Sequence, residues 1–324
     1  MKKSVQLFVA AAAAAFALCA GAQDAYPTKR IQLVVPFASG NGIDQLAREY
    51  AEVLRTELKQ PVVVENREGA GGIIGGTVVM RAAPDGYTAM VAAHPPFAIA
   101  TLLQKTPAFD ASSSFEPVAR VGAVPLVAVT ASSMPFKTWQ EMAAYFRAHP
   151  DKANYAASGV GSPGQLFTQL IKAKTGLPLQ EISYKSTAQA LTDVLAGQVQ
   201  VSLVSVPAAA EHIRTGALRL LAVGSSKRLA AYPDTPTIAE LIGQPGFEAS
   251  VWYGFLMPAG TPAARVNKFY DEIAKASAAP RIVEFMARAS IVPGLQNPQQ
   301  FAKSIHDDVE TARKMIQVAK LRPE

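Results

Sequence analysis

The sequence predicts an α/β protein built from two units. Its 324 residues are enough for two domains of ordinary size, each with its own core. Apolar residues make up 49% of the chain and charged residues 17%, a composition that excludes a disordered chain. Short β-rich runs alternate with longer helical patterns along most of the sequence, which is typical of parallel sheets covered by helices.

The first 22 residues are predicted to be a secretory signal peptide. Lys2 and Lys3 precede an unbroken apolar run over residues 7–20, and Ala20-Gly21-Ala22 resembles a cleavage site. We predict cleavage after Ala22, which would also remove Cys19, the only cysteine. A buried N-terminal helix and a lipoprotein anchor on Cys19 are the alternatives. No later segment is long and apolar enough to cross a membrane, so we expect a soluble exported protein without disulfides.

The first unit follows a strand–helix–strand–helix–strand order. Apolar residues at helical spacing follow the first strand, and a Pro84-Asp85-Gly86 turn leads into the third. This order predicts parallel strands with helices on both faces of the sheet. We expect strands at 31–35, 61–64 and 87–92 and helices at 43–58 and 73–83.

A second unit is predicted to start near Val124-Pro125. Thr138 and Glu141 have the spacing of a capping box, so a helix should begin between them. After this unit a strand starts at Ser250, and we expect Thr261 to cap a helix with Pro262 at its first position. Amphipathic helical patterns continue to the end of the chain. The unit itself should hold strands at 126–130, 154–157, 182–184, 199–206 and 218–223, and helices at 138–148, 163–174, 188–196 and 208–215.

Two glycine-containing loops, 37–42 and 158–164, each follow a strand and open a helix. Unpaired N–H groups at a helix N-terminus carry about half a positive charge, so each loop can seat an anion. Neither loop contains Lys or Arg, so backbone amides and neutral side chains would hold the anion. Two tight turns without a binding role remain an equal alternative at this point. The candidate side chains are Ser39, Asn41, Ser158 and Ser162.

Two other glycine patterns favour different interpretations. Gly159, Gly161 and Gly164 match the dinucleotide-binding pattern, with Glu181 at the distance of a ribose-binding acid. However, Glu181 should begin its strand rather than end it, and an exported protein rarely meets NAD. The cluster over residues 69–76 lacks a following G-K-[ST], so we interpret it as a loop and a closely packed helix.

Enzymatic, metal-binding and nucleic-acid-binding functions find little support in the sequence. No G-x-S-x-G motif occurs, and the four histidines show no metal-ligand spacing, so we expect no metal and no cofactor. Of these, His94 lies at a strand end, where it could face a cleft. The net charge is 31 − 25 = +6, and +4 without Lys2 and Lys3. These charges are scattered, so we expect no nucleic-acid partner.

The chain resembles a known family through many short motifs in a specific order and spacing. It is similar to the Bug family of TctC-like extracytoplasmic solute receptors, the binding proteins of tripartite tricarboxylate transporters. The resemblance covers nearly all of the mature chain. The motifs include Val34-Val35-Pro36-Phe37, Glu65-Asn66-Arg67, Ala83-Pro84-Asp85-Gly86-Tyr87-Thr88, Asn154-Tyr155-Ala156, Tyr184-Lys185, Leu191-Thr192-Asp193, Gly197-Gln198-Val199 and Pro258-Ala259-Gly260-Thr261-Pro262.

The resemblance implies a two-lobed periplasmic-binding-protein fold of the Venus flytrap, type II-like kind. The second lobe, 125–250, would be inserted into the first, formed by 26–124 and 251–324. The lobes would close on a small organic carboxylate in the periplasm and deliver it to the membrane permease subunits. We therefore expect a monomeric, non-enzymatic receptor. A periplasmic enzyme or a signalling receptor on the same fold remains the alternative.

The resemblance also implies which residues bind the ligand. Asn41 stands where glycine is usual, Gln165 where His is common, and Ser186 where Gly is usual; Ala93-His94-Pro95 replaces a stretch with small hydroxyl groups. Val204 stands where many members carry Asp, which disfavours a ligand with an ammonium group because that cation would lack a partner. The expected ligand-binding residues are Phe37, Ala38, Ser39, Gly40, Asn41, Gly42, His94, Ser158, Gly159, Gly161, Ser162, Gln165 and Val204.

Overall fold

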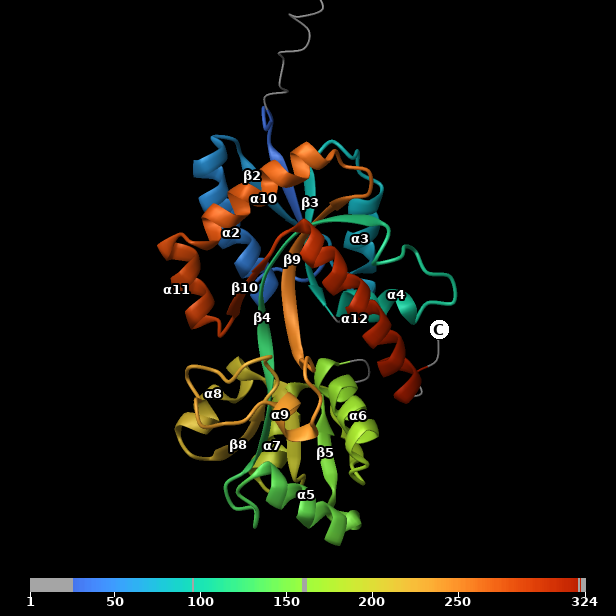
Figure 1. The fold of residues 1–324 in the computed structure, drawn as a ribbon, viewed down its shortest axis with the longest axis vertical. Coiled ribbons are helices and arrows are strands. Elements are labelled where there is room, and N and C mark those ends of the chain that lie inside the picture. Colours follow the sequence, from blue (N-terminus) through green and yellow to red (C-terminus); the bar gives the residue numbers. More distant parts are fainter. Residues whose placement is uncertain (1–25, 95, 159–161, 320, 322–324) are drawn as a thin grey trace, which may run out of the picture.

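Two α/β lobes lie end to end, joined by two long strands (Figure 1). The structure is a computed structural model and describes residues 26–94, 96–158, 162–319 and 321. The predicted signal peptide and residues 159–161 of the second glycine loop lie outside the described residues. The predicted two-lobed α/β fold is confirmed, with the second lobe inserted into the first.

The first lobe is a mixed sheet between two layers of helices. Its parallel strands are β1 (Ile31–Val35), β2 (Val62–Asn66) and β3 (Thr88–His94), in the order β2-β1-β3. Strands β9 (Ser250–Pro258), β4 (Phe115–Ala131) and β10 (Val292–Gln296) extend it with antiparallel pairs. One face carries α2 (Gly42–Leu58), α10 (Ala263–Ser277) and α11 (Pro280–Arg288), and the other carries α3 (Ile73–Met80), α4 (Pro96–Leu102) and α12 (Pro298–Val318).

The second lobe repeats this layered plan. Parallel strands β6 (Gln180–Ser183), β5 (Asn154–Ala157) and β7 (Val201–Ser205) meet the end of β4, and β8 (Leu218–Val223) pairs with β4 as well. One face carries α7 (Thr187–Leu195) and α8 (Val206–Arg214). The other carries α5 (Trp139–Ala148), α6 (Pro163–Thr175) and α9 (Ile238–Ile242). Two short 3₁₀ turns, Ala70–Gly72 and Pro150–Lys152, complete the described elements.

Strand β4 belongs to both lobes. Its first part pairs with β9, and from Leu126 onward it pairs with β7 and β8. Strand β9 carries the chain back into the first lobe. The sequence predicted only 126–130 of β4, because Pro117 and two register shifts interrupt the alternating pattern before that point. The lobe boundaries at 124/125 and 250/251 stay a prediction, since they fall inside β4 and at the start of β9.

Among the residues that the structure describes, the hydrophobic core passes from lobe to lobe on one side only. On the side of α12 and α6, buried residues of both lobes, among them Trp252, Phe301 and Phe167, form one cluster. On the opposite side each lobe has its own cluster, around Phe255 in the first lobe and Leu191 in the second. The two lobes therefore share packing along α12 and α6 and are joined elsewhere mainly through β4 and β9.

Several local predictions need correction. The Thr138 hydroxyl accepts from the Glu141 amide as expected, but the Glu141 carboxylate accepts from the amide of Lys137, so the capping box is incomplete. Pro262 is the N-cap of α10 rather than its first residue, and Thr261 donates to the Pro258 carbonyl. Helix α3 ends at Met80 rather than at residue 83, and α4, α9 and β10 were not predicted. Most other elements lie within two or three residues of their predicted positions.

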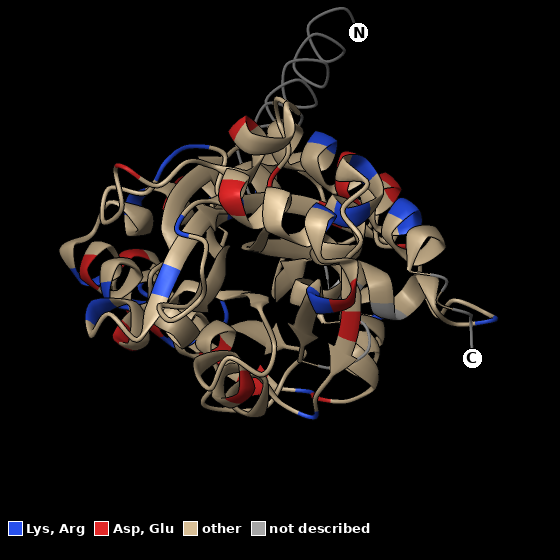
Figure 2. Ribbon diagram, turned by 90° about the horizontal axis from the view of Figure 1, so that it is seen from below, with Lys and Arg blue, Asp and Glu red and all other residues tan. Residues whose placement is uncertain are grey.

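Charged residues are spread over the surface rather than gathered in a stripe. Seen from below, basic and acidic residues are interspersed on the same helices (Figure 2). Several form ion pairs one helical turn apart, as Arg55 does with Glu52 and Lys268 with Glu272. On this face, the described basic residues are therefore dispersed among acidic ones and form no continuous positive patch.

A substitution at Gly164 tests how closely α6 packs on its sheet. A Cβ atom there would lie 2.2 Å from the Leu203 carbonyl oxygen, so Gly164→Ala should push α6 away from β7. We expect a loss of about 1–3 kcal/mol in the free energy of unfolding, measured by urea denaturation. Gly294→Ala is the matched control, because its nearest atom would be 4.0 Å away. Equal stability of the two variants would contradict this packing role.

Candidate ligand-binding site

The parallel strands of both lobes end at the boundary between the lobes. His94, the last residue of β3, is opposite Trp252, which in turn pairs with Ala123 of β4. Ser205, the last residue of β7, pairs with Leu126 of β4. These two levels on β4 are three residues apart, a rise of roughly 10 Å. The carboxyl ends of the strands in one lobe therefore point toward those in the other.

Helices leave these strand ends toward opposite faces. In the first lobe, α2 follows β1 to one face and α4 follows β3 to the other; in the second lobe, α6 follows β5 and α8 follows β7 in the same divergent manner. Open α/β sheets bind ligands outside the carboxyl ends of their strands, at the point where neighbouring strands send their helices to opposite faces. We call this region the strand-end site. Its described residues are those of loop 36–41, together with Ser158, Ser162, His94 and Ser205.

The first loop is held in place by the buried carboxylate of Asp44. Asp44 is 1% exposed and accepts from the Gly40 amide at 2.8 Å, Arg48 Nε at 3.0 Å and Asn66 Nδ2 at 2.9 Å. Burial alone would raise the pKa of Asp44, but these hydrogen bonds hold the pKa below its usual value. Gly40 has φ +85°, which favours glycine. The loop is therefore preorganised without a ligand.

The predicted residues of this loop are accessible. Ala38, Ser39, Gly40 and Gly42 are exposed, and Phe37 and Asn41 are half-buried. The loop is also supported from behind, since a Cβ on Gly75 of α3 would lie 2.7 Å from Pro36. This contact agrees with the closely packed helix predicted for the third glycine cluster.

Asn41 acts as the N-cap of α2. Its Oδ1 accepts from the Asp44 amide at 2.9 Å, which leaves its amide nitrogen as the group that can reach a ligand. A residue that sequence reasoning missed lies beside it: the Tyr253 hydroxyl is 3.5 Å from where a Cβ of Gly42 would be. A tyrosine early in the returning strand was the only sequence signal for this position.

In the second lobe, Ser162 likewise caps its helix. Its Oγ accepts from the Gln165 amide at 3.4 Å, and Ser158 is half-buried directly after β5. Gly159 and Gly161 lie outside the described residues. The two seats thus share one plan, in which a neutral N-cap side chain opens a long helix, of 17 residues in α2 and 13 in α6.

Gln165 is buried in a polar network rather than lying at the surface. Its Nε2 donates to Glu181 Oε1 at 2.7 Å, and the other oxygen of Glu181 accepts from the Tyr155 hydroxyl at 2.6 Å. Glu181 is the second residue of β6, away from the carboxyl end of that strand. Its position and its engaged carboxylate disfavour the dinucleotide interpretation.

Val204 is packed away from the strand-end site. It is 5% exposed and belongs to the apolar cluster under α7 and α8 with Val127 and Leu191. A ligand contact by Val204 stays a prediction. The next residue, Ser205, was missed: it is the N-cap of α8 but makes no side-chain cap, and strand alternation turns it to the opposite face from Val204.

His94 is buried against the returning strand. It is 7% exposed, its ring stacks on Trp252 with centroids 5.4 Å apart, and its Nδ1 lies 3.9 Å from Asp308 Oδ2. Burial, assisted by nearby Arg120, lowers the pKa of His94 to about 3, so the ring is neutral at physiological pH. Its Nε2 has no partner among the described residues. Ligand contact by His94 also stays a prediction.

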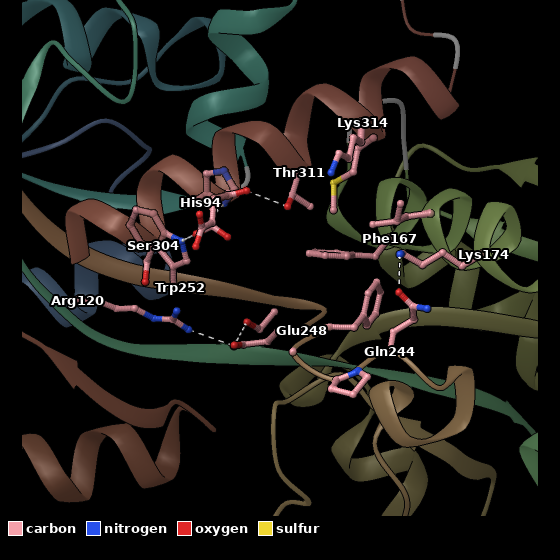
Figure 3. Close-up of a pocket in the computed structure, with 18 residues that line it drawn as sticks. His94, Arg120, Phe167, Lys174, Gln244, Glu248, Trp252, Ser304, Thr311 and Lys314 are labelled. Atoms are coloured by element: carbon pink, nitrogen blue, oxygen red, sulfur yellow. Dashed lines mark hydrogen bonds and ion pairs between the residues drawn. The ribbon is translucent and has the colours of Figure 1, made fainter. Parts of the chain in front are cut away.

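A cavity of about 400 Å³ lies between the lobes on the side of α12 and α6 (Figure 3). We call it the hinge cavity. Strands β3, β4 and β9 and helix α12 line it from the first lobe, and α6 and residues 244–248 line it from the second. Of the predicted ligand-binding residues that the structure describes, only His94 reaches it. Its walls mix buried apolar side chains with charged ones, which no local motif indicated.

The acidic side chains of the hinge cavity are all engaged. Glu248 pairs with Arg120 at 3.1 Å, Asp307 pairs with Lys303, and Asp308 Oδ2 accepts from Trp252 Nε1 at 2.6 Å. Burial raises the pKa of Asp308 to about 6, against the opposing effects of the Trp252 hydrogen bond and Arg120.

The described residues hold no cluster of three or more His, Cys, Asp or Glu side chains able to bind a metal ion. Among the helices in the described part of the chain, none combines the length and apolar character that a bilayer crossing requires.

The fold and strand-end site define a two-lobed solute-binding protein, and comparison with known proteins identifies the family. Residues 46–321 match the model of the tripartite tricarboxylate transporter family receptor, so the chain belongs to this family. The chain is 36% identical over 307 residues to protein BugT of Bordetella pertussis, covering 94% of this chain and 93% of BugT.

Two solved structures show the same fold. A TctC solute-binding protein from Polaromonas, solved with no ligand, superposes with a TM-score of 0.83 at 25% identity, covering 90% of this chain and 99% of that one. Rpa4515 of R. palustris, solved with adipate, gives a TM-score of 0.72 at 30% identity, covering 92% and 100%. The sequence-based assignment to the Bug family is therefore confirmed.

The shifted pKa values of Asp308 and His94 predict opposing effects of pH on stability. Asp308 has a pKa of about 6 when folded and near 3.8 otherwise, so its contribution is present at low pH and is lost as pH rises from 4 to 6. His94 has a pKa of about 3 when folded and near 6.5 otherwise, so its contribution is present above pH 6.5 and is lost as pH falls. Between pH 4 and 6 the two groups change the free energy of unfolding in opposite directions, so their effects partly cancel.

Asp308→Asn should remove the contribution of Asp308 to the pH dependence of stability and leave that of His94. We expect the variant to gain about 1–2 kcal/mol at neutral pH, less than the full shift implies because the Asp308 side chain is 32% exposed. Its stability should then fall more steeply than wild type below pH 6.5. Urea denaturation from pH 4 to 8 measures both effects, with His94→Gln as the reciprocal variant. Parallel pH profiles for Asp308→Asn and wild type would contradict the assignment.

Proposed function

We propose that this protein captures a small organic carboxylate at the strand-end site, by closure of its two lobes, for a tripartite tricarboxylate transport system. The observation that carries the proposal is the arrangement of α2 and α6. Both helices start at strand ends that point to the boundary between the lobes, and both start with neutral N-caps, Asn41 and Ser162. A ligand with two acceptor groups would thus be gripped by one seat in each lobe.

The chemistry of the seats favours a carboxylate. Helix N-termini offer N–H donors and a partial positive charge, and loop 37–42 contains no acidic side chain that would repel an anion. The nearest carboxylate, Asp44, is buried and neutralised by Arg48. Binding through neutral donors costs little desolvation compared with a buried ion pair and suits rapid release to a partner.

The ligand we favour is an acid without an amino group, such as a dicarboxylate. Adipate in the structure of Rpa4515 is a dicarboxylate, and that protein shares this fold at 30% identity. Loop 37–42 supplies no acidic side chain to pair with an ammonium group. A body with apolar or aromatic character is compatible with the half-buried Phe37 beside the first seat.

The present arrangement of the lobes suits a protein ready to receive ligand. It superposes better on the ligand-free Polaromonas structure than on the adipate complex, although the identity with the latter is higher. The exposed first loop fits this interpretation. We therefore propose capture by closure, without turnover, in a monomer exported to the periplasm after cleavage at Ala22, with delivery to the permease subunits.

A thermal-shift screen against mono-, di- and tricarboxylates and amino acids tests this function. An acid present at one hundred times its dissociation constant should stabilise the protein by about 2.7 kcal/mol, which raises Tm measurably. We expect the largest shifts from acids without an amino group. Tighter binding of glutamate or aspartate than of every other acid would contradict the ligand class, and turnover of a bound acid would indicate an enzyme.

Asn41→Asp tests the first seat without disturbing the helix. Asp is as good an N-cap as Asn, so stability should change little. The added negative charge should weaken capture of the best acid from the screen by about tenfold or more, measured by calorimetry. Asn297→Asp is the matched control, because Asn297 caps α12 through the same kind of hydrogen bond. Unchanged affinity in Asn41→Asp would exclude this seat.

A further inference from the structure

The hinge cavity contains cations without acidic partners, in addition to its engaged carboxylates. Among the described residues, the Lys174 ammonium of α6 bonds only to the Gln244 side-chain oxygen, at 3.1 Å, and Lys314 of α12 has no side-chain partner. The cavity's third cation, Arg120, is occupied by Glu248. Because the acids are already engaged, an entering anion would find two lysines available.

The two lysines come from different lobes and reach the same end of the cavity. Figure 3 shows Lys314 on α12 and Lys174 on α6 at the end opposite His94, Trp252 and Arg120, with Phe167 between them in this view. An anion that contacts both ammonium groups would therefore bridge the first lobe to the second.

Apolar side chains line the cavity beside these lysines. Phe167 is 5% exposed, Leu170 7% and Met315 1%, and all three line the cavity. Phe247 packs edge-on against Phe167, with ring centroids 6.3 Å apart. These side chains favour a flat or branched apolar body at this end of the cavity.

We propose that the hinge cavity is a second binding site, for a monocarboxylate with an aromatic body, whose carboxylate bridges Lys174 and Lys314. This site is distinct from the strand-end site, because His94 is the only described residue of the strand-end site that also lines the hinge cavity. The volume of about 400 Å³ is sufficient for a single aromatic ring with its acid group.

Occupancy of this site should oppose ligand capture. The cavity is shaped by the present arrangement of the lobes, and an anion that binds this arrangement selects it over a closed one. By linkage, a ligand that closes the lobes should in turn weaken binding in the hinge cavity. This coupling, unlike the site itself, rests on the proposed function.

Calorimetry with benzoate as the probe tests the site. Wild type should bind benzoate saturably in the hinge cavity, and Lys174→Met and Lys314→Met should each weaken this binding by about fivefold to tenfold, because each removes one charge-assisted contact while keeping side-chain bulk. Lys152→Met is the matched control, an exposed lysine of the second lobe outside the cavity. Its benzoate affinity should equal that of wild type.

Asn41→Asp separates the two sites. It should leave the lysine-dependent benzoate affinity unchanged while it weakens capture at the strand-end site. Absence of saturable benzoate binding, or binding lost in Asn41→Asp and kept in both lysine variants, would overturn the second site. Benzoate binding that depends on the lysines, together with no acid found in the thermal-shift screen, would support this site and count against the proposed function.

Discussion

The passage of β4 through both sheets is the constraint on which the rest of the structure depends. Because one strand pairs with β9 in the first lobe and with β7 and β8 in the second, the two sheets share a continuous backbone connection. The antiparallel pairing of β4 with β7 reverses the direction of the second lobe's parallel strands relative to the first lobe's. Their carboxyl ends, and the helix N-termini that follow them, are therefore brought toward one another.

The two sides of the connection through β4 and β9 differ in how the lobes pack. On one side, α12 and α6 join the lobes through a shared apolar cluster; on the other, each lobe keeps a separate core. The two candidate sites also differ in their basic side chains. The seats at α2 and α6 hold no lysine or arginine among their described residues, whereas the hinge cavity holds Arg120, Lys174 and Lys314. Capture by neutral donors and electrostatic bridging are thus available at different places in one protein.

Local patterns were reliable where an element carries its own signal. The apolar, β-rich run of Ile31–Val35 predicted β1, and the apolar spacing of 43–58 predicted α2. The first half of β4 was missed because bulges and Pro117 break its alternation, although neighbouring strands hold it in the sheet. Asn41 and Ser162 were found as candidate site residues, but their role as helix caps emerged only from the hydrogen bonds they make.

The sequence by itself determined the α/β order, the absence of lysine and arginine from the two glycine loops and, through its motifs, the family. These are properties of residues close together in the chain, set by propensity, capping and composition. Only the tertiary structure decided that Val204 packs inward, that His94 stacks on Trp252 and approaches Asp308, and that Lys174 and Lys314 share a cavity. The residues in these contacts lie far apart in sequence, and they meet because the sheet register and the crossing strands bring their elements together.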